Sequence, residues 1–310
     1  MSKQAFVFPG QGSQSVGMLA ELADHYPQIQ QTFANASQVL DYDLWDLVQR
    51  DPDAQLNQTH ITQPALLTAS VAIYRLLIEL GVKSPAYMAG HSLGEYSALV
   101  CAGVLSLQDA VKLVEARGRF MQQAVPDGQG AMYAIIGLED AIIQQICQQV
   151  QQDTDLVIAP VNYNSPGQVV IAGSKEAADK AAQLCKDAGA KRALPLSVSV
   201  PSHCALMQPA ADMLRAMIND MPFSAPSVPV VNNVDVAVSQ NADTIKDALV
   251  RQLYCPVRWT ESVQYLASEG VTHIFEIGPG KVLAGLIKRI DKSIEVDAIN
   301  TPSGVEELLS

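Results

Sequence analysis

Apolar residues fall along this chain in two kinds of segment, which predict two kinds of structure. Short and almost continuous apolar runs over residues 5–8, 86–89, 228–232 and 273–277 are typical of buried strands. In longer segments the apolar residues recur every three or four positions, which predicts helices. These helices are expected over residues 18–23, 63–80, 96–102, 107–121, 204–221, 244–253, 259–268 and 281–290. Because strands and helices alternate, the pattern predicts an α/β fold with a mostly parallel, covered sheet.

The pattern changes between residues 127 and 199. Strands are expected there over 131–136, 156–162, 168–172 and 191–198, with helices over 139–151 and 174–188. Asn164-Ser165-Pro166-Gly167 predicts a hairpin turn, Ser174 a helix cap and Gly189 a helix end. The order β-α-β-β-α-β is typical of a ferredoxin-like unit. We therefore expect a large subdomain formed by residues 1–126 and 200–310 and a small inserted subdomain formed by residues 127–199.

The composition narrows the class of protein. Of 310 residues, 48% are hydrophobic and 17% charged, which is ordinary for a soluble globular chain. The net charge of −12 argues against nucleic acid as a partner, because phosphate binding needs a basic surface. Five widely spaced cysteines predict reduced thiols and neither a disulfide framework nor a metal site. The N-terminus lacks a signal-peptide core and the most apolar stretch, 64–80, carries charges, so we expect a cytoplasmic protein outside the membrane.

The strongest chemical signal is Gly90-His91-Ser92-Leu93-Gly94, between an expected strand and an expected helix. This Gly-x-Ser-x-Gly pattern in that context is typical of a nucleophile elbow, in which the serine sits on a strained turn between two residues that must lack side chains. The main-chain amide of Leu93 and the helix dipole would then stabilise an oxyanion. The alternative is a plain Gly-Ser turn.

A serine nucleophile needs a base, and five histidines are available. His91 adjoins Ser92, but neighbouring side chains on an elbow diverge. His25 and His60 have polar surroundings in the sequence and His273 opens a strand, so His203, where the small subdomain rejoins the large one, is the best candidate. No acidic residue stands out as its orienting partner, and a carbonyl or amide could take that place.

The glycine-rich loop over residues 9–14 follows the first strand and admits three interpretations. A dinucleotide fingerprint needs a third small residue at position 15, followed by a helix and by an acidic residue about 20 positions further on, and Gly10, Gly12 and Ser15 fit this pattern poorly. It could instead offer its amides as an anion-binding nest that faces the serine. The third interpretation is a simple connecting loop.

Seven motifs spread over nearly the whole chain carry a resemblance to a known family. They are Phe8-Pro9-Gly10-Gln11-Gly12-Ser13-Gln14, Gln63-Pro64-Ala65, Gly90-His91-Ser92-Leu93-Gly94-Glu95, Arg117-Gly118-Arg119, Asn162-Tyr163-Asn164-Ser165-Pro166-Gly167-Gln168, Pro201-Ser202-His203 and Gly278-Pro279-Gly280. Together they resemble the malonyl-CoA:acyl carrier protein transacylases of bacterial fatty acid synthesis. The resemblance implies an α/β-hydrolase-like large subdomain with a ferredoxin-like insert.

The same resemblance implies the roles of six residues. Ser92 would take the malonyl group, His203 would act as base, and Gln252 would orient His203 through its main-chain carbonyl. The main-chain amides of Gln11 and Leu93 would form the oxyanion hole. Arg117 would bind the malonyl carboxylate. On the residues alone, apart from the family resemblance, Arg117 would be interpreted as a solvated charge on a helix face.

The implied reaction moves a malonyl group from malonyl-CoA to the phosphopantetheine thiol of acyl carrier protein, through a Ser92 ester. The expected partners are these two molecules. A monomer is expected, with no metal and no tightly bound cofactor. Two alternatives remain open on residues alone: a serine hydrolase, in which water takes the acyl group, and a non-catalytic protein that binds a carrier protein.

Overall fold

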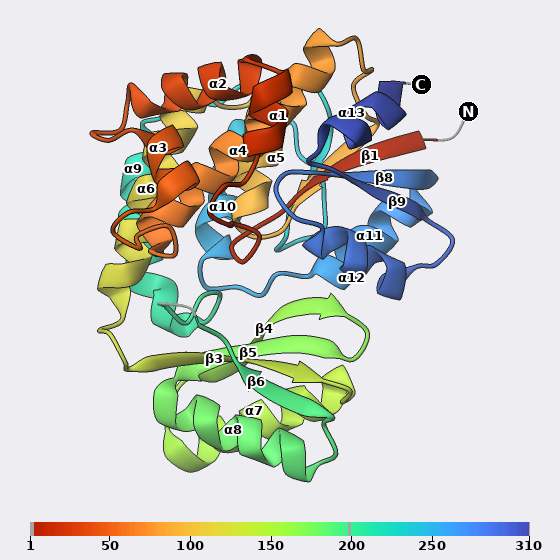
Figure 1. Ribbon diagram of the computed structural model, residues 1–310. Coiled ribbons are helices and arrows are strands. Elements are labelled where there is room, and N and C mark those ends of the chain that lie inside the picture. The colour runs from red at the N-terminus through yellow and green to blue at the C-terminus, as the bar shows by residue number, and fades with distance from the viewer. Residues whose placement is uncertain (1–2, 198–199, 310) are drawn as a thin grey trace.

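Two separate β-sheets organise the molecule (Figure 1). A computed structural model describes residues 3–197 and 200–309. The larger sheet has five strands and the smaller has four. The small sheet, coloured from olive-yellow to blue-green in Figure 1, lies below the large one and is formed by one continuous stretch of chain.

The five-stranded sheet is parallel throughout, in the order β7-β2-β1-β8-β9. Its strands are β1 (Lys3–Phe8), β2 (Tyr87–Gly90), β7 (Val230–Val231), β8 (Val271–Ile277) and β9 (Glu295–Ile299). Side chains of β1 alternate between two cores: Phe6 and Phe8 pack on one face, Ala5 and Val7 on the other. Both faces are therefore covered, which explains why the strand is apolar at every central position.

Helices cover the two faces unequally (Figure 1). The larger core contains residues of α1 (Ala20–His25), α2 (Gln28–Ser37), α3 (Leu44–Arg50), α4 (Thr59–Glu79), α5 (Leu93–Cys101), α6 (Leu107–Ala124), α9 (Gln208–Asn219), α10 (Ala242–Gln252) and α13 (Pro302–Leu309). The opposite face is covered by α11 (Trp259–Ser268) and α12 (Val282–Ile290). The predicted covered parallel sheet is confirmed.

Helix α4 is the one helix of the described chain that is long and apolar enough to cross a membrane. Of its most apolar window, 83% is buried inside the protein. It packs against α2, α5 and α6, so its apolar surface is accounted for by the core of the large subdomain. It begins at Thr59, one turn before the predicted start at residue 63, and contains Pro64 within its first two turns.

The small sheet is antiparallel, with strand order β4-β5-β3-β6. Its elements are β3 (Gly130–Ile136), α7 (Asp140–Thr154), β4 (Ile158–Ser165), β5 (Gln168–Ser174), α8 (Lys175–Asp187) and β6 (Arg192–Pro195). Helices α7 and α8 share a core with one face of the sheet, and the other face packs on Cys204 of the large subdomain. This topology is the ferredoxin-like arrangement that the sequence predicted; the exact subdomain boundaries stay a prediction.

Several local expectations differ from the structure. Helices α2, α3 and α13 and strand β9 were not predicted. The expected strand 191–198 spans only Arg192–Pro195 as β6, and residues 198 and 199 lie outside the described chain. Ser174 precedes α8 as predicted, but its side chain makes no capping hydrogen bond, whereas Gly189 ends the helix with a φ of +102°.

Candidate functional site

Ser92 lies on the turn between β2 and α5, with φ 52° and ψ −109°. A non-glycine residue at positive φ is strained, and such strain persists only where the surroundings impose it. Here the surroundings are close backbone contacts. A Cβ on Gly90 would lie 1.9 Å from the main-chain carbon of Gly94, and a Cβ on Gly94 would lie 2.0 Å from the carbonyl oxygen of Phe8. The two glycines are therefore required by the predicted elbow.

Asn233, which the sequence analysis missed, fixes the backbone of this turn. Its side-chain Oδ1 accepts a hydrogen bond from the Ser92 amide at 2.8 Å, and its Nδ2 donates to the Gly90 carbonyl at 2.7 Å. The residue is fully buried. The available signal was topological: Asn233 follows β7, which pairs with β2 in a parallel sheet, so both carboxyl ends lie at the same edge.

His203 contacts the serine hydroxyl directly. Its Nε2 lies 2.8 Å from Ser92 Oγ, and its Nδ1 lies 2.6 Å from the main-chain oxygen of Gln252. Because a carbonyl only accepts hydrogen bonds, the network assigns the proton to Nδ1 and leaves Nε2 free to accept one. Burial, reinforced by the positive charge of Arg117, lowers the pKa of His203 to about 3. The imidazole is therefore neutral near pH 7.

Arg117 lies inside this site and not on the solvated face of α6. Its side chain is 1% exposed, and its Nη2 lies 3.4 Å from Ser92 Oγ. Nη1 donates to Gln63 Oε1 at 2.9 Å and Nη2 to Gln252 Oε1 at 3.0 Å, while the guanidinium packs over the Tyr96 ring. No acidic side chain within residues 3–197 or 200–309 forms an ion pair with it. A buried cation held only by neutral acceptors is suited to an anionic ligand.

Gln252 connects these groups at the end of α10. Besides its contacts with His203 and Arg117, its Nε2 donates to the Ser92 carbonyl at 3.1 Å and to Glu95 Oε2 at 2.8 Å. The sequence carried no local signal for this residue, and only the family resemblance pointed to it. The resemblance implied only that the main-chain oxygen of Gln252 orients His203, whereas the structure shows that its side chain also contacts Arg117, Ser92 and Glu95.

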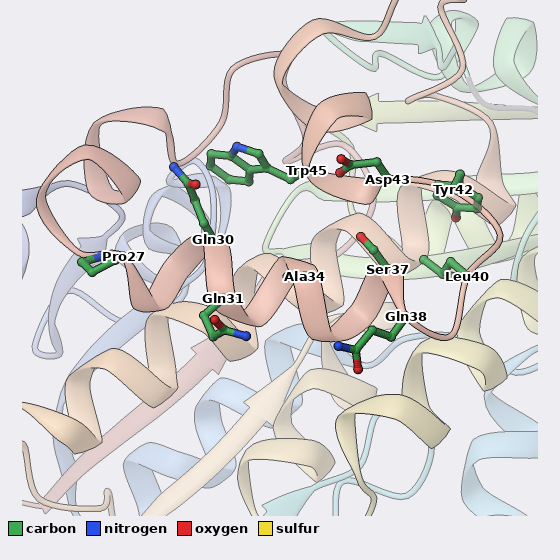
Figure 2. Close-up of a pocket in the computed structure, with 10 residues that line it drawn as sticks. All are labelled: Pro27, Gln30, Gln31, Ala34, Ser37, Gln38, Leu40, Tyr42, Asp43 and Trp45. Carbon is green, nitrogen blue, oxygen red and sulfur yellow. The ribbon is translucent and has the colours of Figure 1, made fainter.

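The cavity at Ser92 is small and has walls from both subdomains. It measures about 100 Å³ and is lined by Gln11, His91, Ser92, Met132, Asn162, Leu196, Val200, Ser202 and His203. Gln11 thus reaches the cavity, and the Leu93 amide, as the first of helix α5, has no acceptor inside its own helix. A larger hollow of about 800 Å³ lies over α2 and the segment from Leu40 to Trp45 (Figure 2), and it shares no lining residue with the cavity at Ser92.

The remaining histidines lie apart from the hydroxyl of Ser92. His91 turns away from it, as expected, and its Nε2 contacts Asn164 Oδ1 of β4 at 2.8 Å. His60 contacts Gln122, and His273 contacts Asp297. Among the described residues, no group of three or more His, Cys, Asp or Glu side chains is arranged to hold a metal ion.

Comparison with known proteins agrees with this geometry. Residues 5–301 match the family model described as the acyl transferase domain. The chain belongs to this acyl transferase family. It is 62% identical over 309 residues to the malonyl CoA-acyl carrier protein transacylase of Escherichia coli strain K12, covering 100% of this chain and 99% of that protein.

Solved structures of family members have the same fold. An acyl carrier protein S-malonyltransferase from Vibrio cholerae is 60% identical with a TM-score of 0.96, covering 99% of this chain and 100% of that one. A malonyl-transacylase in complex with its type II PKS acyl-carrier protein is 58% identical with a TM-score of 0.98, covering 99% of each chain. The predicted family and fold class are confirmed.

The elbow contacts give a stability prediction. Gly90→Ala places a methyl group against the Gly94 backbone, and we expect it to lower the free energy of unfolding by about 3 kcal/mol or more. Gly285→Ala is the control, because its Cβ meets nothing within 4 Å in helix α12, and it should raise stability by about 0.5–1 kcal/mol. Urea denaturation measures both; similar values for the two variants would contradict the close packing.

The neutral state of His203 gives a pH prediction. Its pKa is near 3 when folded against 6.5 for an ordinary histidine, so below pH 6.5 the unfolded chain binds a proton that the folded chain does not. Stability therefore falls as the pH falls. Relative to His203→Gln, the wild type should lose about 1.4 kcal/mol of unfolding free energy per pH unit below 6.5. Urea unfolding at pH 7.5, 6 and 5 measures this, and parallel curves for the two proteins would refute it.

Proposed function

We propose that this protein transfers a malonyl group from malonyl-CoA to the phosphopantetheine thiol of acyl carrier protein, through an ester on Ser92. The observation that carries the proposal is the buried Arg117 guanidinium, 3.4 Å from the Ser92 hydroxyl and without an ion pair in the part of the chain that the structure describes. An acyl group on Ser92 that ends in a carboxylate would satisfy it. The names of the relatives supply the donor and the acceptor.

The first half of the reaction loads the enzyme. Nε2 of His203 takes the proton of Ser92 Oγ as this oxygen attacks the thioester carbonyl carbon of malonyl-CoA. The negative charge that develops on the carbonyl oxygen would be stabilised by the main-chain amides of Gln11 and Leu93. The carbon–sulfur bond then breaks, and the CoA sulfur leaves with the proton from His203. A neutral imidazole at the start is what this step requires.

The second half runs in the opposite sense. His203 takes the proton of the phosphopantetheine thiol, and the sulfur attacks the Ser92 ester carbonyl. The carbon–oxygen bond breaks and Ser92 Oγ recovers the proton. A serine hydrolase would use water at this point; the small cavity, whose apolar wall includes Met132, Leu196 and Val200, favours the thiol by limiting water.

Gln252 acts as a positioning residue in this scheme. Its main-chain oxygen holds His203 in the tautomer that can accept a proton, the part that a carboxylate plays in other triads. Its side-chain oxygen holds Arg117 at the acyl pocket. These steps need no tightly bound cofactor and no metal. We infer a cytoplasmic monomer that meets the carrier protein in solution.

Covalent capture tests the nucleophile and the reaction class together. Incubation with malonyl-CoA should add one malonyl mass, located by peptide mass spectrometry on the peptide that contains Ser92. Ser92→Ala should remove the label, and addition of holo acyl carrier protein should discharge the wild type faster than water does. Label on buried Cys204, next to His203, or discharge by water at an equal rate would overturn the proposal.

Arg117 should set the choice of acyl group. A guanidinium can bind the malonyl carboxylate through two charge-assisted hydrogen bonds, and loss of one partner of such a buried pair costs about 2–5 kcal/mol. Arg117→Ala should therefore lower kcat/KM for malonyl-CoA by roughly 30-fold to several thousand-fold, while kcat/KM for acetyl-CoA stays the same or rises. Arg117→Lys should restore little. Equal losses for malonyl and acetyl transfer would show that Arg117 is structural and that the carboxylate binds elsewhere.

A further inference from the structure

Glu95 is a buried carboxylate that the mechanism above leaves unused. It lies on α5, one turn after Ser92, and is 2% exposed. Its Oε2 accepts hydrogen bonds from Gln252 Nε2 at 2.8 Å and from the Asn233 amide at 3.0 Å. Both donors are neutral, and among the residues that the structure describes neither the negative charge of Glu95 nor the positive charge of Arg117 has an ion-pair partner in direct contact.

These two buried charges face each other across one amide group. The Gln252 side chain donates from Nε2 to Glu95 and accepts at Oε1 from Arg117. An ionised carboxylate only accepts and a guanidinium only donates, so this orientation of the amide is the one that satisfies both. The amide dipole then lies along the line of the two charges, and each charge lowers the cost of burying the other.

Unlike an ordinary salt bridge, this arrangement places no carboxylate directly on the N–H donors of Arg117. Three hydrogen bonds from Arg117 are made, to Gln63, Gln252 and Ser92, and its Nε has no hydrogen-bond partner within the described chain. A carboxylate in direct contact would occupy these donors and would have to be displaced by a substrate. A carboxylate one amide away balances the charge without occupying a guanidinium N–H itself.

We propose that Glu95 is a positioning residue that balances the charge of Arg117 through the Gln252 amide and so keeps the guanidinium free for the carboxylate of the acyl group. This inference rests on the proposed function, in which that carboxylate is malonyl. Burial raises the pKa of Glu95 to about 7, against the opposing effect of its two hydrogen bonds and of Arg117, so the experiments below are run at pH 8.5, where the carboxylate is ionised.

The test uses Glu95→Gln, which keeps the shape and an accepting oxygen but removes the charge. In the free variant the buried cation lacks its balancing charge, and we expect Tm to fall by about 4 °C or more. Once a malonyl ester occupies Ser92, its carboxylate supplies a negative charge, so malonyl loading should raise Tm more in the variant than in the wild type. An acetyl ester brings no charge and should give no such excess.

The same substitution should shift selectivity. Because the acyl pocket becomes more positive, the ratio of kcat/KM for malonyl-CoA to that for acetyl-CoA should rise about three- to tenfold. A residue that only packs would lower both values and leave the ratio unchanged. Glu276→Gln is the matched control: Glu276 is also fully buried, but it accepts from main-chain amides of Leu283 and Ala284 at the start of α12. Glu276→Gln should lower Tm equally with and without malonyl on Ser92, and it should leave the malonyl-to-acetyl ratio of kcat/KM unchanged.

A double variant tests whether the effect of Glu95→Gln depends on Arg117. It also covers the case in which Glu95→Gln alone does not fold. With Arg117→Gln also present both charges are gone, so the double variant should be more stable than Glu95→Gln alone, and Glu95→Gln should no longer change the selectivity ratio. A double variant less stable than Glu95→Gln, or an unchanged malonyl-to-acetyl ratio and unchanged Tm gain in Glu95→Gln, would overturn the inference. If the wild type takes malonyl on Ser92 and Arg117→Ala abolishes the preference for malonyl over acetyl, the proposed function stands whatever the results for Glu95.

Discussion

The hydrogen bonds of Gln252 tie together groups that arrive from distant parts of the chain. One residue holds the base by its main-chain oxygen, the guanidinium by its side-chain oxygen, and the Ser92 carbonyl and Glu95 by its side-chain nitrogen. Ser92 is half-buried and the other groups are buried. A buried polar network is stable only when every member has a partner. The position of α10 relative to the elbow therefore determines the geometry of Ser92, His203 and Arg117 at once.

The cavity is formed where two independently packed bodies meet. The large subdomain supplies Gln11, Ser92 and His203, and the small sheet supplies Met132 and Asn162. The two are joined by main-chain hydrogen bonds between β4 and the segment at Val257, and by the contact of His91 with Asn164. The cavity at Ser92 therefore lies at an interface inside one chain.

The sequence predicted those parts of the structure that depend on short-range patterns. The elbow could be found because strand, glycine, serine and helix are adjacent, and His203 because few histidines compete for its place. Helix α2 was missed because two of its four buried residues are Thr32 and Ala36, so that Ile29 and Phe33 alone mark the helical period. Strand β9 was missed because the other strands of its sheet are almost continuous apolar runs, whereas β9 alternates charged with apolar residues at the sheet edge. Asn233 and the side-chain contacts of Gln252 arise from tertiary approach, which leaves no trace in local spacing.

The small sheet has a further consequence for how this enzyme family can diversify. Its helices and one face form a core of their own, while its other face supplies a wall of the acyl cavity. Substitutions that repack that separate core can tilt or shift the wall without disturbing the strained serine or its base. The shape of the cavity would then change through residues that do not line it, while Ser92 and His203 keep their geometry in the other half of the molecule.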